Sequence, residues 1–298
     1  MNKREIAVEL KQIQFTKVVS EWNKLKSLKP EEIEDINGRS RLGCDFIDYY
    51  FFLNRLDTIG NKGINFFDFL KDIEKYKEKK YIQNLLEYCD KNNRYNDSLI
   101  KRYYYCYGLC FGRINGFKIT NAMSIYYKFK PHTILDPFCG FGGRLVAAMI
   151  LDINYIGIDI NKHLNDGYNR LLSDFSHETN SKIQIIYEDS NLINYGGYVY
   201  DMVFTSPPYE NIEIYQNSKV LTSVEWDIFY KSIFKKTWDG LCDNGIYVIN
   251  INDNIYNKIL VKMFGECEEK IILKKSSKNS YQEYIYIWKK HKNIIECI

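Results

Sequence analysis

The feature that most constrains the fold is a glycine-rich turn between an apolar strand and an apolar helix. The strand is HTILD (132–136), the turn is DPFCGFGGR (136–144), and the helix is GRLVAAMI (143–150). Gly140, Gly142 and Gly143 permit a tight turn and let a ligand approach bare backbone. A strand, turn and helix in this order begin a unit of a parallel sheet.

The alternation of strand and helix continues toward the C-terminus. The further expected strands are YIGIDI, IQIIYED, YDMVFT and GIYVINI, the helices are LNDGYNRLLSDF and 225–241, and EKIILKK and EYIYIWKK form a terminal hairpin. Strands that alternate with helices predict an α/β fold with a doubly wound, Rossmann-like parallel sheet. We therefore expect this domain over residues 113–298, with an antiparallel hairpin at its end.

Residues 1–112 predict a mainly helical accessory or target-recognition region. Residues 5–28 have the periodicity of one amphipathic helix, and residues 71–107 are helical again. The first 130 residues hold 24 Lys and Arg against 17 Asp and Glu, whereas the remainder is mildly acidic. A basic half suits a protein that meets a polyanion with one face, although a solvated helix surface explains the charge equally well.

The cysteines and the apolar runs limit the class of protein. Eight cysteines are scattered without a CxxC pair, and only four histidines are present, so no metal site is expected. No apolar run approaches the roughly 18 residues that a membrane span needs. We expect a protein of a reducing intracellular compartment, cytoplasmic or nuclear, without a membrane partner. The sequence leaves its oligomeric state open.

Two aspartates follow the next strands. Asp159 ends YIGID, about 20 residues beyond the turn, where a carboxylate is placed to accept hydrogen bonds from ribose hydroxyls. Asp189 ends IIYED and could accept a bond from an adenine amino group. A helix cap is the competing interpretation, and for Asp189 it is nearly as strong.

The segment TSPPYE, residues 205–210, directly follows the strand YDMVF. Neither Pro207 nor Pro208 can donate a backbone hydrogen bond, so the pair predicts a rigid loop at a strand end. Such a loop can present carbonyl groups and the ring of Tyr209 to a flat substrate.

The turn DPFCGFGGR followed by TSPPY resembles the DNA amino-methyltransferases, which methylate adenine N6 or cytosine N4. The resemblance covers about residues 113–290, and GGRLVAAMI, YIGIDIN and VFTSPPYENIEIY look most like viral and phage members. It implies the S-adenosylmethionine-dependent methyltransferase form of the Rossmann-like sheet. Family turns more often read GxGT or GxGS, so the role of Arg144 is left open.

The resemblance also implies roles for single residues. S-adenosylmethionine would be held by Asp136, Pro137, Phe138, Gly140, Gly142, Asp159, Asp189 and Lys118, the last in the segment 115–118 that precedes the first strand. Ser206 and the Pro207 carbonyl would accept hydrogen bonds from the target amino group, Pro208 would stiffen the loop, and Tyr209 would stack on the base. A base within a duplex must be flipped out to reach the methyl group.

The target stays open between adenine N6 and cytosine N4. No segment between or after the two motifs is long enough for a recognition domain, so we expect either that residues 1–112 recognise the target or that the enzyme has low sequence specificity. The basic candidates for phosphate contact there and just beyond are Arg39, Arg41, Arg55, Lys62, Lys101, Arg102 and Arg113. The expected partner is DNA. The alternatives are an enzyme that methylates RNA or a protein amide, and a module that binds nucleic acid without catalysis.

Overall fold

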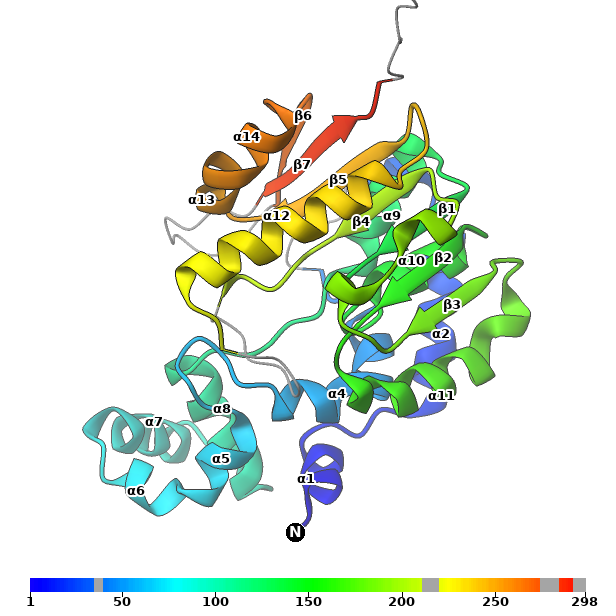
Figure 1. Cartoon of the computed structure of the whole chain (residues 1–298). Coiled ribbons are helices and arrows are strands. Elements are labelled where there is room, and N and C mark those ends of the chain that lie inside the picture. The colour runs from blue at the N-terminus through cyan, green and yellow to red at the C-terminus, as the bar shows by residue number, and fades with distance from the viewer. Residues whose placement is uncertain (35–39, 211–219, 274–283, 292–298) are drawn as a thin grey trace, which may run out of the picture.

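The computed structural model describes residues 1–34, 40–210, 220–273 and 284–291. Within them lies a seven-stranded sheet with the order β3-β2-β1-β4-β5-β7-β6 (Figure 1). Its strands are β1 (Thr133–Asp136), β2 (Asn154–Ile158), β3 (Ile183–Ile186), β4 (Met202–Thr205), β5 (Ile246–Ile251), β6 (Glu269–Ile272) and β7 (Tyr284–Lys289). Strands β1 to β5 pair in parallel, and β7 runs antiparallel between β5 and β6. The predicted α/β class and the terminal hairpin are confirmed, and β6, not β7, forms the edge of the sheet.

Helices cover both faces of the sheet. One face carries α9 (Ile119–Phe129), α10 (Gly143–Ile150) and α11 (Asn165–Phe175), and the other carries α12 (Ser223–Asp239), α13 (Asp253–Ile255), the π-helical turn η6 (Tyr256–Leu260) and α14 (Val261–Phe264). Short 3-10 turns lie between these elements: η1 (Lys162–Leu164), η2 (Ser176–Glu178), η3 (Ser190–Leu192) and η4 (Tyr195–Gly197). Because side chains alternate along a strand, Ile134 joins one core and Leu135 the other.

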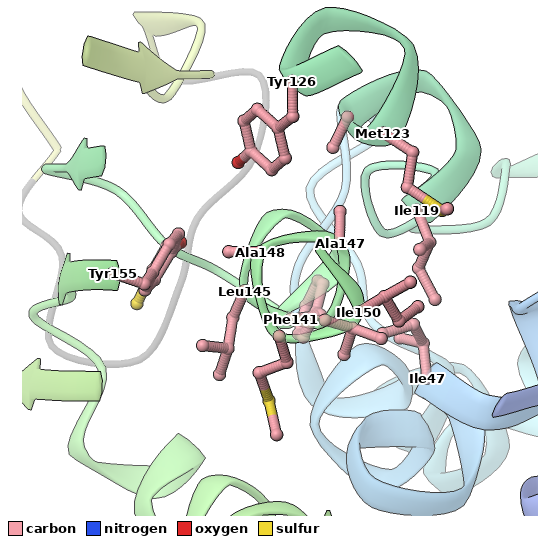
Figure 2. Close-up of a cluster of buried hydrophobic side chains, with 14 of the residues drawn as sticks. Ile47, Ile119, Met123, Tyr126, Phe141, Leu145, Ala147, Ala148, Ile150 and Tyr155 are labelled. Carbon is pink, nitrogen blue, oxygen red and sulfur yellow. The ribbon is translucent and has the colours of Figure 1, made fainter. Parts of the chain in front are cut away.

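Helix α10 is buried on every side, and Arg144 is its one charged residue. All eight of its residues are buried. Figure 2 shows its side chains between Met123 and Tyr126 of α9, Ile47 of the N-terminal region and Tyr155 of β2. This burial on all sides fixes the start of the helix, and with it the glycine-rich turn that precedes it.

The N-terminal region is helical, as predicted. It contains α1 (Lys3–Leu10), α2 (Phe15–Ser27), α3 (Pro30–Glu34), α4 (Cys44–Asp57), α5 (Phe66–Lys71), α6 (Ile73–Lys77), α7 (Lys80–Lys91) and α8 (Leu99–Cys110). Helices α2 and α4 share the core of the sheet, whereas α5, α7 and α8 surround a separate small core, at the lower left of Figure 1. The hydrophobic cores therefore do not divide at residue 112, and the division into 1–112 and 113–298 stays a prediction.

The single helix expected over residues 5–28 is wrong. The chain leaves α1 at Lys11 in an extended conformation and begins α2 at Phe15. The Lys11 ammonium lies 2.8 Å from Asp45 and also pairs with Asp48. These ion pairs with α4 stabilise the break between α1 and α2, although the amphipathic periodicity of the sequence continues across it. Among all the helices within the described ranges, none is long and apolar enough to cross a membrane.

Candidate active site

The chain changes direction across the sheet between β1 and β4. After β1 it crosses to β2 and β3, whereas β4 and β5 lie on the other side of β1. In open parallel sheets, ligands bind outside the carboxyl ends of the strands at such a switch point. Both sequence motifs lie there, because the turn begins at Asp136 of β1 and Ser206 directly follows β4.

Asp136 is a buried hub beneath the turn. Its carboxylate accepts hydrogen bonds from the N–H of Phe138 (3.2 Å) and from the hydroxyls of Tyr155 (2.5 Å) and Thr205 (2.8 Å). The residue is fully buried and does not line the cavity described below. Since Thr205 precedes Ser206, Asp136 connects the two motifs. In this structure Asp136 supports the turn, and the contact with the cofactor expected of it stays a prediction.

Arg144 is the ion-pair partner of Asp136. Its Nε donates to the Asp136 carboxylate at 2.6 Å, and its Nη2 donates to the carbonyl of Phe138 at 2.6 Å. Burial alone would lower the pKa of Arg144, but the charge of Asp136 raises that pKa above its ordinary value. Arg144 therefore stays charged, and its role is to hold the turn in shape.

Asp159 directly follows β2 and faces the turn. Its Oδ2 accepts the N–H of Gly140 (2.8 Å), and its Oδ1 accepts the N–H of Asn161 (2.9 Å). Burial raises the pKa of Asp159 to about 6, and the two N–H groups oppose this rise only in part. Gly140 has a φ of 54°, in the left-handed region that favours glycine. Each carboxylate oxygen keeps a lone pair for a ligand hydroxyl.

Four of the other predicted cofactor residues line the same cavity as Asp159, namely Phe138, Gly140, Asp189 and Lys118. Asp189 caps η3 by accepting the N–H of Asn191 at 2.9 Å. The Asn191 side-chain oxygen is buried and has no hydrogen-bond partner within the part of the chain that the structure describes.

Pro137 and Gly142 support the turn from behind the cavity and do not line it. The Pro137 carbonyl accepts a hydrogen bond from the Ser190 hydroxyl at 2.5 Å. Gly142 has a φ of 78°, and a Cβ there would lie 3.4 Å from the ring of Phe51. In this structure both residues support the turn, and the cofactor contact expected of them stays a prediction.

The loop from Ser206 to Tyr209 borders the crevice beside β4, and all four of its residues line the cavity. The Ser206 hydroxyl lies 3.2 Å from the Tyr209 hydroxyl and donates to Oδ1 of Asn250 on β5, also at 3.2 Å. The Tyr209 hydroxyl lies 3.0 Å from the same Oδ1. The Tyr230 hydroxyl of α12 donates to the Pro208 carbonyl at 2.6 Å. The loop is thus held from both β5 and α12.

The cavity has a volume of about 1400 Å³. Pockets for one small ligand usually measure about 300–1,000 Å³, so this cavity is larger than one such ligand needs. The strand-end loops form one wall, and residues of α4, α8 and the segment before α9 form a second. A third wall is aromatic, where Phe229 of α12 lies 5.8 Å from Phe138 between ring centroids.

Gly143 is the point where the segment before α9 touches the turn. A Cβ on Gly143 would lie 2.0 Å from the carbonyl oxygen of Phe117, a backbone atom that cannot yield alone. We expect Gly143→Ala to lower the free energy of unfolding by about 1–3 kcal/mol, measured by urea denaturation. Gly197→Ala is the control, because a Cβ there meets no atom within 4 Å. Equal losses in the two variants would contradict this account.

Four side chains that build the site were not among the predicted residues: Tyr155, Thr205, Tyr230 and Asn250. Asn250 left a signal, since it is a lone polar residue within the apolar strand GIYVINI. Thr205 belongs to the singled-out segment TSPPYE, but no sequence signal links its hydroxyl or that of Tyr155 to Asp136, because strand pairing brings them there.

No protein-family model matches the sequence, and a search of curated proteins finds no match. Among solved structures, TrmN from Thermus thermophilus is similar with a TM-score of 0.42 and 13% identity, covering 58% of this chain and 48% of TrmN. An rRNA methylase from Streptococcus thermophilus is similar with a TM-score of 0.42 and 11% identity, covering 60% of this chain and 99% of the methylase. RsmC from T. thermophilus, in complex with AdoMet and guanosine, is similar with a TM-score of 0.41 and 15% identity, covering 61% of this chain and 45% of RsmC. The chain thus spans about half the length of TrmN and of RsmC.

Proposed function

We propose that this protein is an S-adenosylmethionine-dependent methyltransferase that methylates an exocyclic amino group of a DNA base, adenine N6 or cytosine N4. One observation carries the proposal. The turn with Asp159 and the loop Ser206–Tyr209 face one cavity at the switch point of the sheet. A cofactor subsite and an amine-accepting subsite are thereby adjacent.

The residues on the cofactor side fit S-adenosylmethionine. The Asp159 carboxylate can accept from ribose hydroxyls, and Asp189, which lines the same cavity, can accept from an adenine amino group. The left-handed backbone of Gly140 leaves the turn open to close approach. When bound, the cofactor supplies an electrophilic methyl group on a sulfonium centre.

The other side of the cavity supplies acceptors for an amine. An exocyclic amino group is a poor nucleophile because its lone pair is delocalised into the ring. The Ser206 hydroxyl and the Pro207 carbonyl can accept its two N–H bonds and draw the nitrogen toward tetrahedral geometry, which frees the lone pair. Fixed placement of the amine lowers the barrier by removing its freedom of orientation. Stacking on Tyr209 would offset the cost of unstacking the base.

The wall formed by the N-terminal region supports a nucleic acid as the partner. Arg41 and Arg113 line this wall and are exposed, and the Arg113 guanidinium lies 4.3 Å from the ring centre of Tyr104. Arg55 and Lys11 of the same wall are paired with Asp48. Arg41 lies 4.0 Å from Asp45, but its side chain is 77% exposed against 13% for Arg55. Their exposure makes Arg41 and Arg113 the better candidates for phosphate contact. Arg39 lies outside the described residues.

A methylation assay with labelled cofactor tests the proposal. Duplex DNA, single-stranded DNA and RNA are each incubated with the protein, and the nucleosides are analysed by mass spectrometry. N6-methyladenine or N4-methylcytosine in DNA is the expected product. A modified nucleoside in RNA alone would move the substrate to RNA, and a methylated protein amide would move it to protein. Intact cofactor binding without any methylated acceptor would favour a binding module.

Asp159 makes cofactor affinity depend on pH. Ribose hydroxyls donate to the carboxylate, and its pKa of about 6 in the free protein means that it becomes protonated as the pH falls through 6. We therefore expect the dissociation constant, measured calorimetrically from pH 8 to pH 5, to rise by up to about tenfold per pH unit below 6. Asp159→Asn should weaken binding at pH 8 by at least about tenfold and flatten the profile.

The pH dependence of the cofactor dissociation constant must be assigned to Asp159 and not to other titratable groups near it. Burial raises the pKa of the Cys139 thiol well above its ordinary range, so this thiol does not titrate between pH 5 and 8. His163 is exposed four residues further on, so His163→Gln serves as the matched control. A wild-type profile that is flat, or one that His163→Gln abolishes, would refute the role given to Asp159.

A further inference from the structure

Asn250 is a buried amide at the back of the Ser206–Tyr209 loop. It lies on β5, is 3% exposed, and still lines the cavity. The parallel register of β4 and β5 pairs Thr205 with Ile249, and so places the next residues, Ser206 and Asn250, side by side. An amide in an apolar strand is costly unless all of its polar atoms are used. Here they are used.

The orientation of the Asn250 amide follows from its partners. The backbone carbonyl of Tyr284, on β7, lies 2.9 Å from Nδ2. A carbonyl can only accept, so the nitrogen must face Tyr284 and Oδ1 must face the loop. Oδ1 is an acceptor only, and the hydroxyls of Ser206 (3.2 Å) and Tyr209 (3.0 Å) both approach it. The hydrogen bond to β7 thus determines that Oδ1, and not Nδ2, faces the Ser206–Tyr209 loop.

This orientation decides where the Ser206 proton points. A serine hydroxyl can donate one hydrogen bond and accept two. When its proton goes to Asn250 Oδ1, only lone pairs remain for the cavity. A target amino group also arrives with N–H bonds, so a Ser206 proton aimed into the cavity would repel it. The hydroxyl can therefore act as an acceptor only if something else holds its proton.

We propose that Asn250 is a positioning residue that holds the Ser206 proton and the Tyr209 hydroxyl, so that Ser206 presents an acceptor to the target amine. The role rests on the proposed methyl transfer to an amino group. Asn250 itself needs no contact with the substrate. It acts through Ser206, and this makes its contribution separable from a purely structural one.

A double-variant cycle on the full chain tests the proposal. Single-turnover methyl transfer is measured for the wild type, Ser206→Ala, Asn250→Leu and the double variant. Each single change is expected to slow transfer on the order of tenfold, as for one lost hydrogen bond in the transition state, with the cofactor dissociation constant unchanged. Because Asn250 also holds the Tyr209 hydroxyl, the cycle is run in the Tyr209→Phe background, and there the double variant should be no slower than Ser206→Ala. Losses that multiply would overturn the proposal.

A conservative variant adds a readout that packing alone would not move. In Asn250→Asp, a protonated carboxyl can both donate to the Tyr284 carbonyl and accept from Ser206, whereas a carboxylate faces that carbonyl unfavourably. The rate of Asn250→Asp, as a ratio to the wild type at each pH, is expected to recover as the pH falls. A constant ratio would count against the role.

One measurement keeps this inference separate from the proposed function. If the wild type methylates no acceptor, the proposed function fails and the cycle has no signal. Hydrogen exchange of the amides of Tyr209 and Glu210 then decides about Asn250. Faster exchange in Asn250→Leu, with the amides of α7 unchanged, supports the hold on the loop. Unchanged exchange at Tyr209 and Glu210 overturns it.

Discussion

Arg144→Met is expected to lower the free energy of unfolding by about 3–5 kcal/mol, because it leaves the Asp136 carboxylate buried without its cation. Both side chains are almost fully buried, 3% and 0% exposed, and the Nε lies 2.6 Å from the carboxylate. Domains are stable by only about 5–15 kcal/mol, so this change would remove a large share of the total. Urea denaturation followed by circular dichroism measures the loss.

Two further variants separate the buried charge from ordinary packing. Lys235→Met breaks an exposed ion pair with Asp239 on α12, and a loss below about 1 kcal/mol is expected. Asp136→Asn added to Arg144→Met removes the stranded charge and should restore part of the stability. If Arg144→Met costs no more than Lys235→Met, the pair does not hold the turn.

Tyr209→Ala is expected to lower the rate of methyl transfer on the order of a hundredfold while sparing cofactor binding. The change removes the ring proposed to stack on the base, which is worth about 1–3 kcal/mol per base. It also removes the hydroxyl that joins the loop to Asn250 at 3.0 Å. Single-turnover kinetics and a calorimetric cofactor titration measure the two effects separately.

Tyr209→Phe is the matched control. It keeps the ring and loses the hydroxyl contacts with Ser206 and Asn250, so a smaller loss of several-fold is expected. If Tyr209→Ala raises the cofactor dissociation constant as much as it slows transfer, the residue belongs to the cofactor subsite and the stacking role fails.

The apolar periodicity and the turn chemistry determined the sheet and the place of its ligand crevice. Alternating strands and helices after residue 113 bury their apolar faces in a largely parallel sheet that helices cover on both faces. Glycines after β1 and prolines after β4 then mark the two strand ends at the switch point. These features depend on residues that are neighbours in the chain, and for that reason the amino-acid order alone displays them.

Long-range contacts decided the rest. Strand pairing brings Tyr155 and Thr205 to Asp136, and the start of α10 brings Arg144. Ion pairs of Lys11 with α4 split a helix that the periodicity joined. Helices α2 and α4 entered the main core although they precede residue 112.

The sequence by itself thus determined the α/β architecture and the residue types at its crevice. Only the tertiary structure decided which of these residues line the cavity and which support it from behind. The physical reason is that a buried polar side chain is fixed by its partners, and these come from strands far apart in sequence. Asn250 is the clearest example, because the carbonyl of Tyr284, 34 residues later, orients its amide so that Oδ1 faces Ser206.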